Sequence, residues 1–252
     1  MILPRVIPVL LLQNRGLVKS VNFKDYKYIG DPINAVRIFN EKEVDELCLL
    51  DIEASKHRKE PDYKFIEEIG SEAFMPFAYG GGIINLDQAK RILKLGAEKL
   101  ILNTILFSNI NLVRDIANHV GSQSVVASID IKKNMWGKYT IYSHAMKKSM
   151  SIDISTFIAE LLKAGIGELL INSVDLDGKM QGLDTVLIEQ ISQQINIPMI
   201  TCGGVGNLEH IKRGISSGAD AIAAGSMFVF HGKHKAVLIN YPEREKLKEI
   251  WH

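Results

Sequence analysis

The chain contains the same strand–glycine–helix–strand pattern twice, and this repeat limits the folds that it can adopt. Residues 76–104 and residues 198–226 align without a gap, 122 positions apart, and nine of the 29 aligned positions are identical. A Gly-Gly pair, an Asn-Leu pair and a Gly-Ala pair occupy the same places in both copies. A repeat of about half the chain length indicates a fold built from two similar halves. Chance similarity between two units of equal composition is the alternative.

Short apolar runs alternate with amphipathic segments along the whole chain. We predict strands at 6–12, 46–51, 74–79, 99–103, 124–130, 168–172, 199–202 and 221–224. Helices are predicted at 31–42, 62–69, 86–95, 110–119, 151–164, 184–194, 208–217 and 242–250. Nearly continuous apolar strands are typical of a parallel sheet that is buried on both faces.

Eight strand–helix units and a half-chain repeat together predict the fold class. We expect one α/β domain over residues 1–252, a (β/α)8 TIM barrel with half-barrels of approximately 1–122 and 123–252. A doubly wound open sheet is the alternative, but it would not explain why four units are followed by a copy of four units.

Composition excludes several classes of function. The chain has 252 residues, is 46% hydrophobic and 23% charged, and carries a formal net charge of +1. A near-neutral chain gives no reason to expect a nucleic acid or an acidic membrane surface as a partner. The first apolar run is too short for a membrane span and lacks the end of a signal peptide, so we expect a cytoplasmic protein. Cys48 and Cys202 lie in apolar runs and are expected to be buried thiols without a disulfide.

Function in a barrel belongs at the C-terminal ends of the strands. The predicted strands end at Leu11, Asp51, Gly80–Gly82, Asn103–Thr104, Asp130, Asn172–Ser173, Cys202–Gly204 and Gly225–Ser226. Each of the two glycine loops is followed one unit later by a hydroxyl residue. Glycines let the backbone approach an anion, and the helix that follows offers unpaired N–H groups. We therefore predict two phosphate cradles on opposite sides of one mouth; tight turns without a ligand are the alternative.

Several segments resemble the cyclase subunit of imidazole glycerol phosphate synthase (HisF), over roughly residues 4–230. They are VKSVNF (18–23), GDPINAV (30–36), DELCLLDIEAS (45–55), YGGGI (79–83), SVDLDG (173–178) and CGGVGNLEH (202–210). In that family, a HisH-type glutaminase docks at the N-terminal face of the barrel and releases ammonia. The ammonia passes through the barrel and attacks a bisphosphorylated ribulosyl aminoimidazole precursor, which yields imidazole glycerol phosphate and an aminoimidazole carboxamide ribonucleotide. The resemblance thus implies a lyase-type subunit of a glutamine amidotransferase in histidine biosynthesis, active as a heterodimer.

The resemblance also assigns site residues. The substrate-binding positions that it implies are Lys19, Asp51, Gly82, Asn103, Thr104, Ser173, Asp177, Gly203, Gly204, Gly225 and Ser226. Lys19 is expected on a mobile loop over the mouth, with a solvated surface lysine as the alternative. The ammonia gate that it implies consists of Arg5, Glu46, Lys99 and Glu168, for which a structural ion network is the alternative. No metal or organic cofactor is predicted, because metal-ligand spacing and the dinucleotide fingerprint are both missing.

One position departs from the family pattern. The family places two aspartates as acid and base at the ends of strands one and five; the second is Asp130, but the first falls on Leu11. Leucine carries no proton, and a positioned acid or base contributes roughly 10²–10⁴ in rate, or about 3–5 kcal/mol. Gln13 and Asn14 do not titrate, and Glu53 lies on the loop of another strand.

Three functions remain open. The favoured one is a diverged branch of the family that channels ammonia to a separate sugar amidotransferase, which converts an acetamido sugar to an acetamidino sugar for surface glycans. The second is a true histidine-pathway cyclase with a different acid, and the third is a non-catalytic scaffold that activates a glutaminase. His144 lies in a polar excursion, residues 132–148, which we expect to form a hairpin over the mouth. We interpret His144 as a solvated loop histidine.

Overall fold

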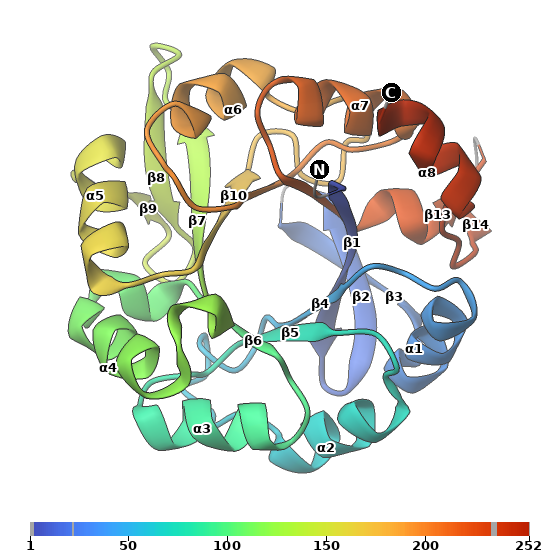
Figure 1. The fold of residues 1–252 in the computed structure, drawn as a ribbon, viewed down its shortest axis with the longest axis horizontal. Helices are drawn as coiled ribbons and strands as arrows, with labels where there is room; N and C mark the ends of the chain where they lie inside the picture. The colour runs from blue at the N-terminus through green and yellow to red at the C-terminus, as the bar shows by residue number, and fades with distance from the viewer. Residues whose placement is uncertain (1–2, 22, 233–235, 252) are drawn as a thin grey trace.

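The computed structural model describes residues 3–21, 23–232 and 236–251. Eight parallel strands close into a barrel, and the helices form a ring around it (Figure 1). Around the barrel the strands are β1 (Arg5–Gln13), β4 (Leu47–Asp51), β5 (Phe77–Gly80), β6 (Lys99–Leu102), β7 (Val125–Lys133), β10 (Glu168–Ser173), β11 (Met199–Cys202) and β12 (Ala221–Ala224). β1 pairs with both β4 and β12, which closes the sheet. The structure confirms the predicted (β/α)8 barrel and excludes the open sheet.

All eight predicted helices are present. They are α1 (Pro32–Glu41), α2 (Tyr63–Glu72), α3 (Leu86–Lys94), α4 (Ile110–Val120), α5 (Ile154–Ala164), α6 (Thr185–Ser192), α7 (Leu208–Ser216) and α8 (Arg244–Trp251). An Asp or Asn precedes each of the first seven, and its side chain accepts a hydrogen bond from the backbone N–H three residues on. This cap satisfies a donor that the helix itself cannot. The repeated Asn-Leu pair is thus the cap and first residue of α3 and of α7.

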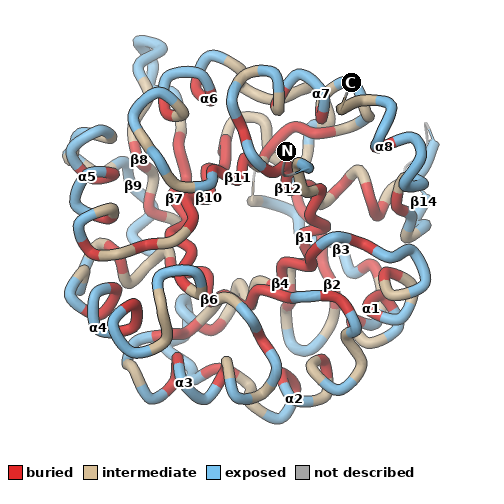
Figure 2. The backbone as a smooth tube through the Cα atoms, in the orientation of Figure 1, coloured by how far each residue is buried: buried red, intermediate tan, exposed pale blue. Residues whose placement is uncertain are grey.

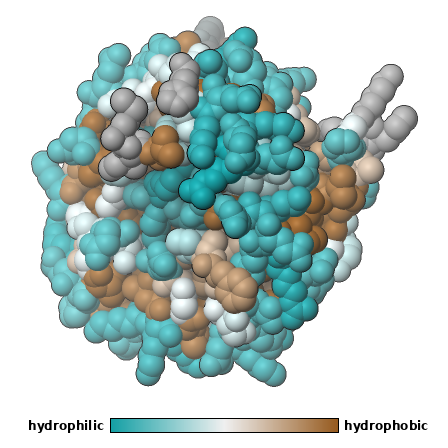
Figure 3. Space-filling view, turned by 45° about the vertical axis from the view of Figure 1, so that its right-hand side comes forward, coloured by the Kyte–Doolittle hydropathy of each residue, from teal (hydrophilic) through white to brown (hydrophobic). Residues whose placement is uncertain are grey.

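Buried side chains form two separate layers because successive residues of a strand point to opposite faces. One layer fills the space between the strands and the helices, and the strands are accordingly buried while the helices expose their outer faces (Figure 2). The second layer lines the bore of the barrel with Ile7, Val9, Cys48, Ala78, Ile101, Val126, Leu170, Ile200, Ala221 and Ala223. The outer face seen in Figure 3 is mostly hydrophilic with smaller apolar patches. Within the described residues, no helix is both long and apolar enough to cross a membrane.

The chain leaves the barrel in two antiparallel hairpins at the mouth, one after β1 and one after β7. After β1 the chain forms an antiparallel hairpin of β2 (Gly16–Val21) and β3 (Lys24–Gly30), which was not predicted. After β7 the expected hairpin is present, as β8 (Tyr139–Ser143) and β9 (Lys148–Ser149). Short 3-10 turns are η1 (Thr104–Phe107), η2 (Ser122–Ser124) and η3 (Ser226–Phe228).

The predicted start of the third barrel strand at residue 74 is wrong. β5 begins only at Phe77, and the side chain of Phe74 is 88% exposed. Pro76 has no N–H to donate to a neighbouring strand, which places the boundary after it. Phe74 instead donates its backbone N–H to Asn40 Oδ1 at 2.9 Å.

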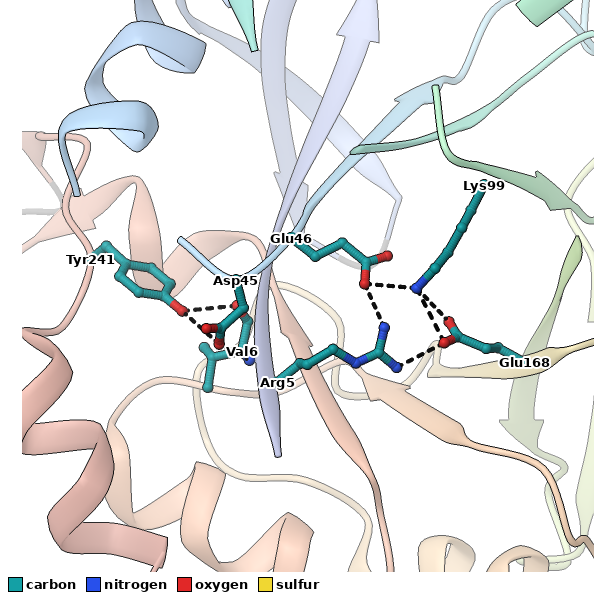
Figure 4. Close-up of polar contacts among 7 residues, drawn as sticks. All are labelled: Arg5, Val6, Asp45, Glu46, Lys99, Glu168 and Tyr241. Carbon is teal, nitrogen blue, oxygen red and sulfur yellow. Dashed lines mark hydrogen bonds and ion pairs between the residues drawn. The ribbon is translucent and has the colours of Figure 1, made fainter. Parts of the chain in front are cut away.

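The C-terminal tail, for which the sequence suggested no role, fastens the first barrel strand. After the short hairpin of β13 (Phe230–His231) and β14 (Ala236–Val237), the buried Tyr241 hydroxyl donates to the Val6 carbonyl at 2.9 Å. Asp45 Oδ2 accepts from the Val6 backbone N–H at 3.0 Å, so both backbone groups of Val6 are held from outside the barrel (Figure 4). The tail therefore steadies the strand that carries Arg5.

Candidate functional site

Four charged side chains close the N-terminal end of the bore. Arg5, Lys99 and Glu168 begin β1, β6 and β10, and Glu46 directly precedes β4. Lys99 Nζ lies 2.8 Å from Glu46 Oε2 and 3.1 Å from Glu168 Oε1, and Arg5 Nη2 lies 3.0 Å from Glu168 Oε1. Arg5 Nη1 also donates to Glu46, so that the four groups alternate in charge around a closed ring (Figure 4). We call these four residues the ion ring; its formation confirms that they meet, while a gating role stays a prediction.

Above the ion ring lies an apolar cavity. It is small, with about 10 Å³ open to the centre of a water-sized molecule, and apart from Glu46 its walls are Ile7, Cys48, Ala78, Ile101, Val126, Leu170, Ile200 and Ala223. The alanines leave space where larger residues of the bore would meet across the axis. An apolar space of this kind admits a small neutral molecule and disfavours an ion, because burying an unpaired charge is costly.

A second cavity, with about 40 Å³ open to the centre of a water-sized molecule, lies at the C-terminal mouth; we call it the upper cavity. Its walls include six of the predicted substrate-binding residues, Lys19, Asp177, Gly203, Gly204, Gly225 and Ser226, together with Leu11. The structure therefore brings the second predicted cradle, the loop lysine and the anomalous leucine into one space. Val9 borders this cavity and also packs in the bore, so the upper cavity lies directly above the apolar layer.

The backbone of this cradle requires glycine. Gly204 has φ +101°, and a Cβ there would lie 2.0 Å from the Gly182 carbonyl oxygen. Any side chain would therefore collide with backbone rather than with a movable side chain. Gly203, Gly204 and the residues that follow lead to the N-terminus of α7, whose unpaired N–H groups favour an anion.

The prediction that Lys19 lies on a mobile loop is wrong. It is part of β2, is 5% exposed and donates its ammonium to the Val9 carbonyl. The antiparallel pairing of β2 with β1 turns the chain back over the mouth and directs this side chain inward. Burial lowers the pKa of Lys19 to about 8, although the Asp177 carboxylate opposes the shift. Burial likewise raises the pKa of Asp177 to about 6, against the effect of Lys19 and with that of Asp130.

The first predicted cradle lies elsewhere on the mouth. Gly82 donates its backbone N–H to Ser55 Oγ at 3.2 Å, and Thr104 begins η1 after Asn103. None of these residues lines the upper cavity, and neither does the buried Ser173 at the end of β10. A ligand that used both cradles would therefore extend from the upper cavity across the mouth.

Asp130 is a buried acidic group of the mouth with two side-chain hydrogen bonds. It is 6% exposed; its Oδ1 accepts from Asn172 Nδ2 at 2.8 Å and its Oδ2 from Asn103 Nδ2 at 2.9 Å. Asn103 directly follows β6 and Asn172 is the penultimate residue of β10, and these strands are the two neighbours of β7, so the carboxylate is held from both sides. Asn172 Oδ1 is buried, and none of the residues that the structure describes forms a hydrogen bond with it.

Two other carboxylates have local partners. Asp51 Oδ1 accepts from the backbone N–H groups of Glu53 and Ala54 at 2.9 and 3.0 Å, and burial raises its pKa while these bonds lower it. Glu53 accepts from Gln13 Nε2 at 3.2 Å and lies 2.6 Å from His57 Nε2. Asp51 thus shapes its own loop, and Glu53 is tied to the rim.

His144 lies in the turn after β8, as expected of a loop histidine, but its ring is only 33% exposed, so the interpretation as solvated is wrong. Its Nε2 is buried, has no hydrogen-bond partner among the described residues and lies 4.0 Å from Asp130 Oδ2. The pairing of Ile131 with Ile141 runs β8 back along β7, so that the end of β8 returns to the level of Asp130. The sequence pattern of the β8–β9 hairpin could have suggested that β8 runs back along β7. The packing of the His144 imidazole, however, depends on Phe23, which comes from the unpredicted β2–β3 hairpin.

Comparison with known proteins agrees with this geometry. A family model described as histidine biosynthesis protein matches residues 5–235. A Pseudomonas aeruginosa protein provisionally named imidazole glycerol phosphate synthase subunit hisF2 is 50% identical over 248 residues, 98% of this chain and 99% of that protein. A Vibrio vulnificus protein provisionally named subunit hisF3 is 46% identical over 258 residues, 99% of this chain and 98% of that protein.

A relative with an unqualified name is also similar along most of its length. Imidazole glycerol phosphate synthase subunit HisF of Exiguobacterium sibiricum is 37% identical over 230 residues, 90% of this chain and 91% of that protein. The match of the family model to nearly the whole barrel, and these identities, establish the family. The chain therefore belongs to the histidine biosynthesis protein family and, within it, to the HisF-type subunits of imidazole glycerol phosphate synthase.

Proposed function

We propose that the chain is the ammonia-accepting barrel subunit of a glutamine amidotransferase. A HisH-type glutaminase docks at the N-terminal face and releases ammonia, which enters through the ion ring and crosses the bore. A phosphorylated acceptor is bound at the C-terminal mouth. The observation that carries this proposal is the alignment of the ion ring, the apolar cavity and the upper cavity along one axis.

The ion ring and the bore suit neutral ammonia. The ring carries two positive and two negative groups, so it closes the bore without a net charge. Ammonium would have to leave its water shell to enter the apolar cavity, at a cost of several kcal/mol. The exposed side chains of Leu3 and Phe74 precede β1 and β5 on the same face and offer apolar contacts to a partner subunit.

The acceptor binds at the upper cavity through a phosphate group. Gly203, Gly204, Gly225 and Ser226 supply the cradle, and the Lys19 ammonium is the nearby cation. Gly82, Asn103 and Thr104 would bind a second anionic group across the mouth, with Asp51, Ser173 and Asp177 at its rim.

Leu11 decides which acceptor is favoured. Without a carboxylate at the end of β1, closure of the histidine-pathway ring loses one proton-transfer group, while delivery of ammonia is unaffected. A diverged subunit that supplies ammonia for an acetamidino sugar fits this pattern, and so do the numbered names hisF2 and hisF3 of two relatives. A separate sugar amidotransferase would then be a further partner.

A true histidine-pathway cyclase is the second candidate. It is favoured by Asp130, which two asparagines orient toward the mouth. Both candidates need the bore, and they differ in the acceptor.

Blocking the bore tests the shared part of the proposal. Ala223→Met places a long side chain in the apolar cavity and changes no residue of the ion ring or of the cradle. Product formation should be measured in the complex with a HisH-type glutaminase, once with glutamine and once with ammonium chloride at high pH, using the histidine-pathway precursor. We expect loss of the glutamine-dependent product only, because ammonium chloride supplies ammonia directly at the mouth. Equal loss with both nitrogen sources, or no loss with either, would refute a conduit.

A further inference from the structure

His144 is a partly buried titratable group at the mouth that the proposed function does not use. Its Nε2 is buried, makes no hydrogen bond to any of the described residues and lies 4.0 Å from Asp130 Oδ2. Polar atoms removed from water are almost always paired, because an unpaired one loses its hydration without compensation. The free nitrogen is therefore available to a molecule bound beside Asp130.

Two aromatic rings hold the imidazole in place. The centroid of the Phe23 ring lies 3.8 Å from that of His144, and the Tyr142 ring meets it edge-on at 4.9 Å. Phe23 comes from the hairpin after β1 and Tyr142 from the hairpin after β7, so the two excursions meet at this histidine. A proton-transfer group needs such fixation, because its reach is only the length of a hydrogen bond.

The surroundings keep the imidazole neutral at pH 7. The groups that face it are Asp130 and Lys132 from β7, Tyr142 from β8 and Phe23 from the β2–β3 turn. Burial lowers the pKa of His144 below its ordinary 6.5; the Asp130 carboxylate opposes this shift and the Lys132 ammonium adds to it. A neutral imidazole accepts a proton, and the adjacent carboxylate stabilises the imidazolium that results.

We propose that His144 is a proton-transfer group for the ammonia reaction, in the role that Leu11 cannot perform. This inference rests on the proposed function. The nitrogen of ammonia bonds to a carbonyl carbon of the acceptor, and the π electrons of the carbonyl move to its oxygen. His144 Nε2 takes one proton from the ammonium nitrogen, and the imidazolium then gives that proton to the oxygen, which completes a carbinolamine. The Asp130 carboxylate stabilises the positive charge of the imidazolium. Both groups therefore lie on the β7 side of the mouth, whereas Leu11 lies on β1.

A double-mutant cycle with ammonium chloride and the histidine-pathway precursor tests this role. In the wild type, His144→Gln should lower kcat by roughly 10²-fold with little change in KM, because a positioned base has been removed. In a Leu11→Asp background the same substitution should cost much less, since a carboxylate again stands at the end of β1. Added imidazole should restore activity to His144→Ala. His119→Gln, an exposed histidine on α4, is the matched control and should leave the rate unchanged.

A pH profile gives a reading that a structural role would not produce. At a constant concentration of free ammonia, the wild-type kcat should fall at a pH below 6.5, where the neutral imidazole is lost, and nitrogen NMR of labelled histidine should show His144 titrating over the same pH range. The His144→Gln variant should lack this acid limb. An equal loss in both Leu11 backgrounds, no rescue by imidazole, or an unchanged acid limb would overturn the inference and leave the proposed function intact. No enzyme-dependent product from either the wild type or Leu11→Asp would overturn both.

Discussion

The substitution Lys99→Met tests whether the ion ring is a coupled, buried unit. Of the two cations of the ring, Lys99 contacts both carboxylates through one atom, at 2.8 Å to Glu46 and 3.1 Å to Glu168. The side chains are 16%, 5% and 11% exposed, respectively, so solvent screens them poorly. Methionine keeps the length of the lysine stem but removes the charge, which leaves Arg5 alone to balance two carboxylates.

The size of the effect follows from burial. Removing one member of a buried ion pair typically costs about 3–5 kcal/mol, because the remaining charge stays buried without compensation. For a domain of this size that corresponds to a fall in Tm of about 6–20 °C. The matched control is Lys133→Met, which breaks the 3.0 Å pair with Asp184. Lys133 is 46% exposed, and a surface pair contributes about 0–1 kcal/mol.

Thermal and urea unfolding followed by circular dichroism at pH 7 and constant salt measure both variants. We also expect Glu46→Gln to recover part of the loss when combined with Lys99→Met, because the double variant restores charge balance in the ring. If Lys99→Met and Lys133→Met were destabilised equally, the ring would be a set of independent, solvent-screened pairs. The same result would remove the reason to regard it as a closed plug.

The remaining predictions concern the mouth. In a His144→Gln background, Leu11→Asp should raise ammonium-dependent turnover of the histidine-pathway precursor by roughly 10²-fold. Leu11→Asn, of equal size but unable to transfer a proton, should not; similar rates for the two variants would show that a carboxylate at position 11 does not act in the reaction. Lys19→Met should raise the stability at pH 7 by about 1–3 kcal/mol, because the unfolded chain holds this proton up to a pKa near 10.4 while the folded chain releases it at about 8. The pH dependence checks the sign. The free energy of unfolding of the wild type should rise between pH 8 and 10.5, and that of Lys19→Met should not, so the difference between the two proteins should shrink over this range. A constant difference would contradict a buried ammonium. Lys19→Met should also weaken the binding of inorganic phosphate, measured by calorimetry.

Periodicity and the internal repeat were enough to predict the barrel. The structure shows that the first seven helices begin after Asp or Asn caps, and the apolar strands lie within a few residues of their predicted positions. The four residues of the ion ring could be placed at strand starts, which a closed parallel barrel must bring together. The half-barrel boundaries of 1–122 and 123–252 remain a prediction from the repeat.

The sequence by itself determined the barrel, the positions of the glycine cradles and the absence of a carboxylate at Leu11, since these depend on local patterns and on residue type. Only the tertiary structure decided that Lys19 is buried against Val9 and that His144 meets Asp130. Both outcomes depend on hairpins that fold back over the mouth, so the contacts join segments far apart in the chain. No local pattern encodes such a contact, because the environment that buries each group is supplied by other strands.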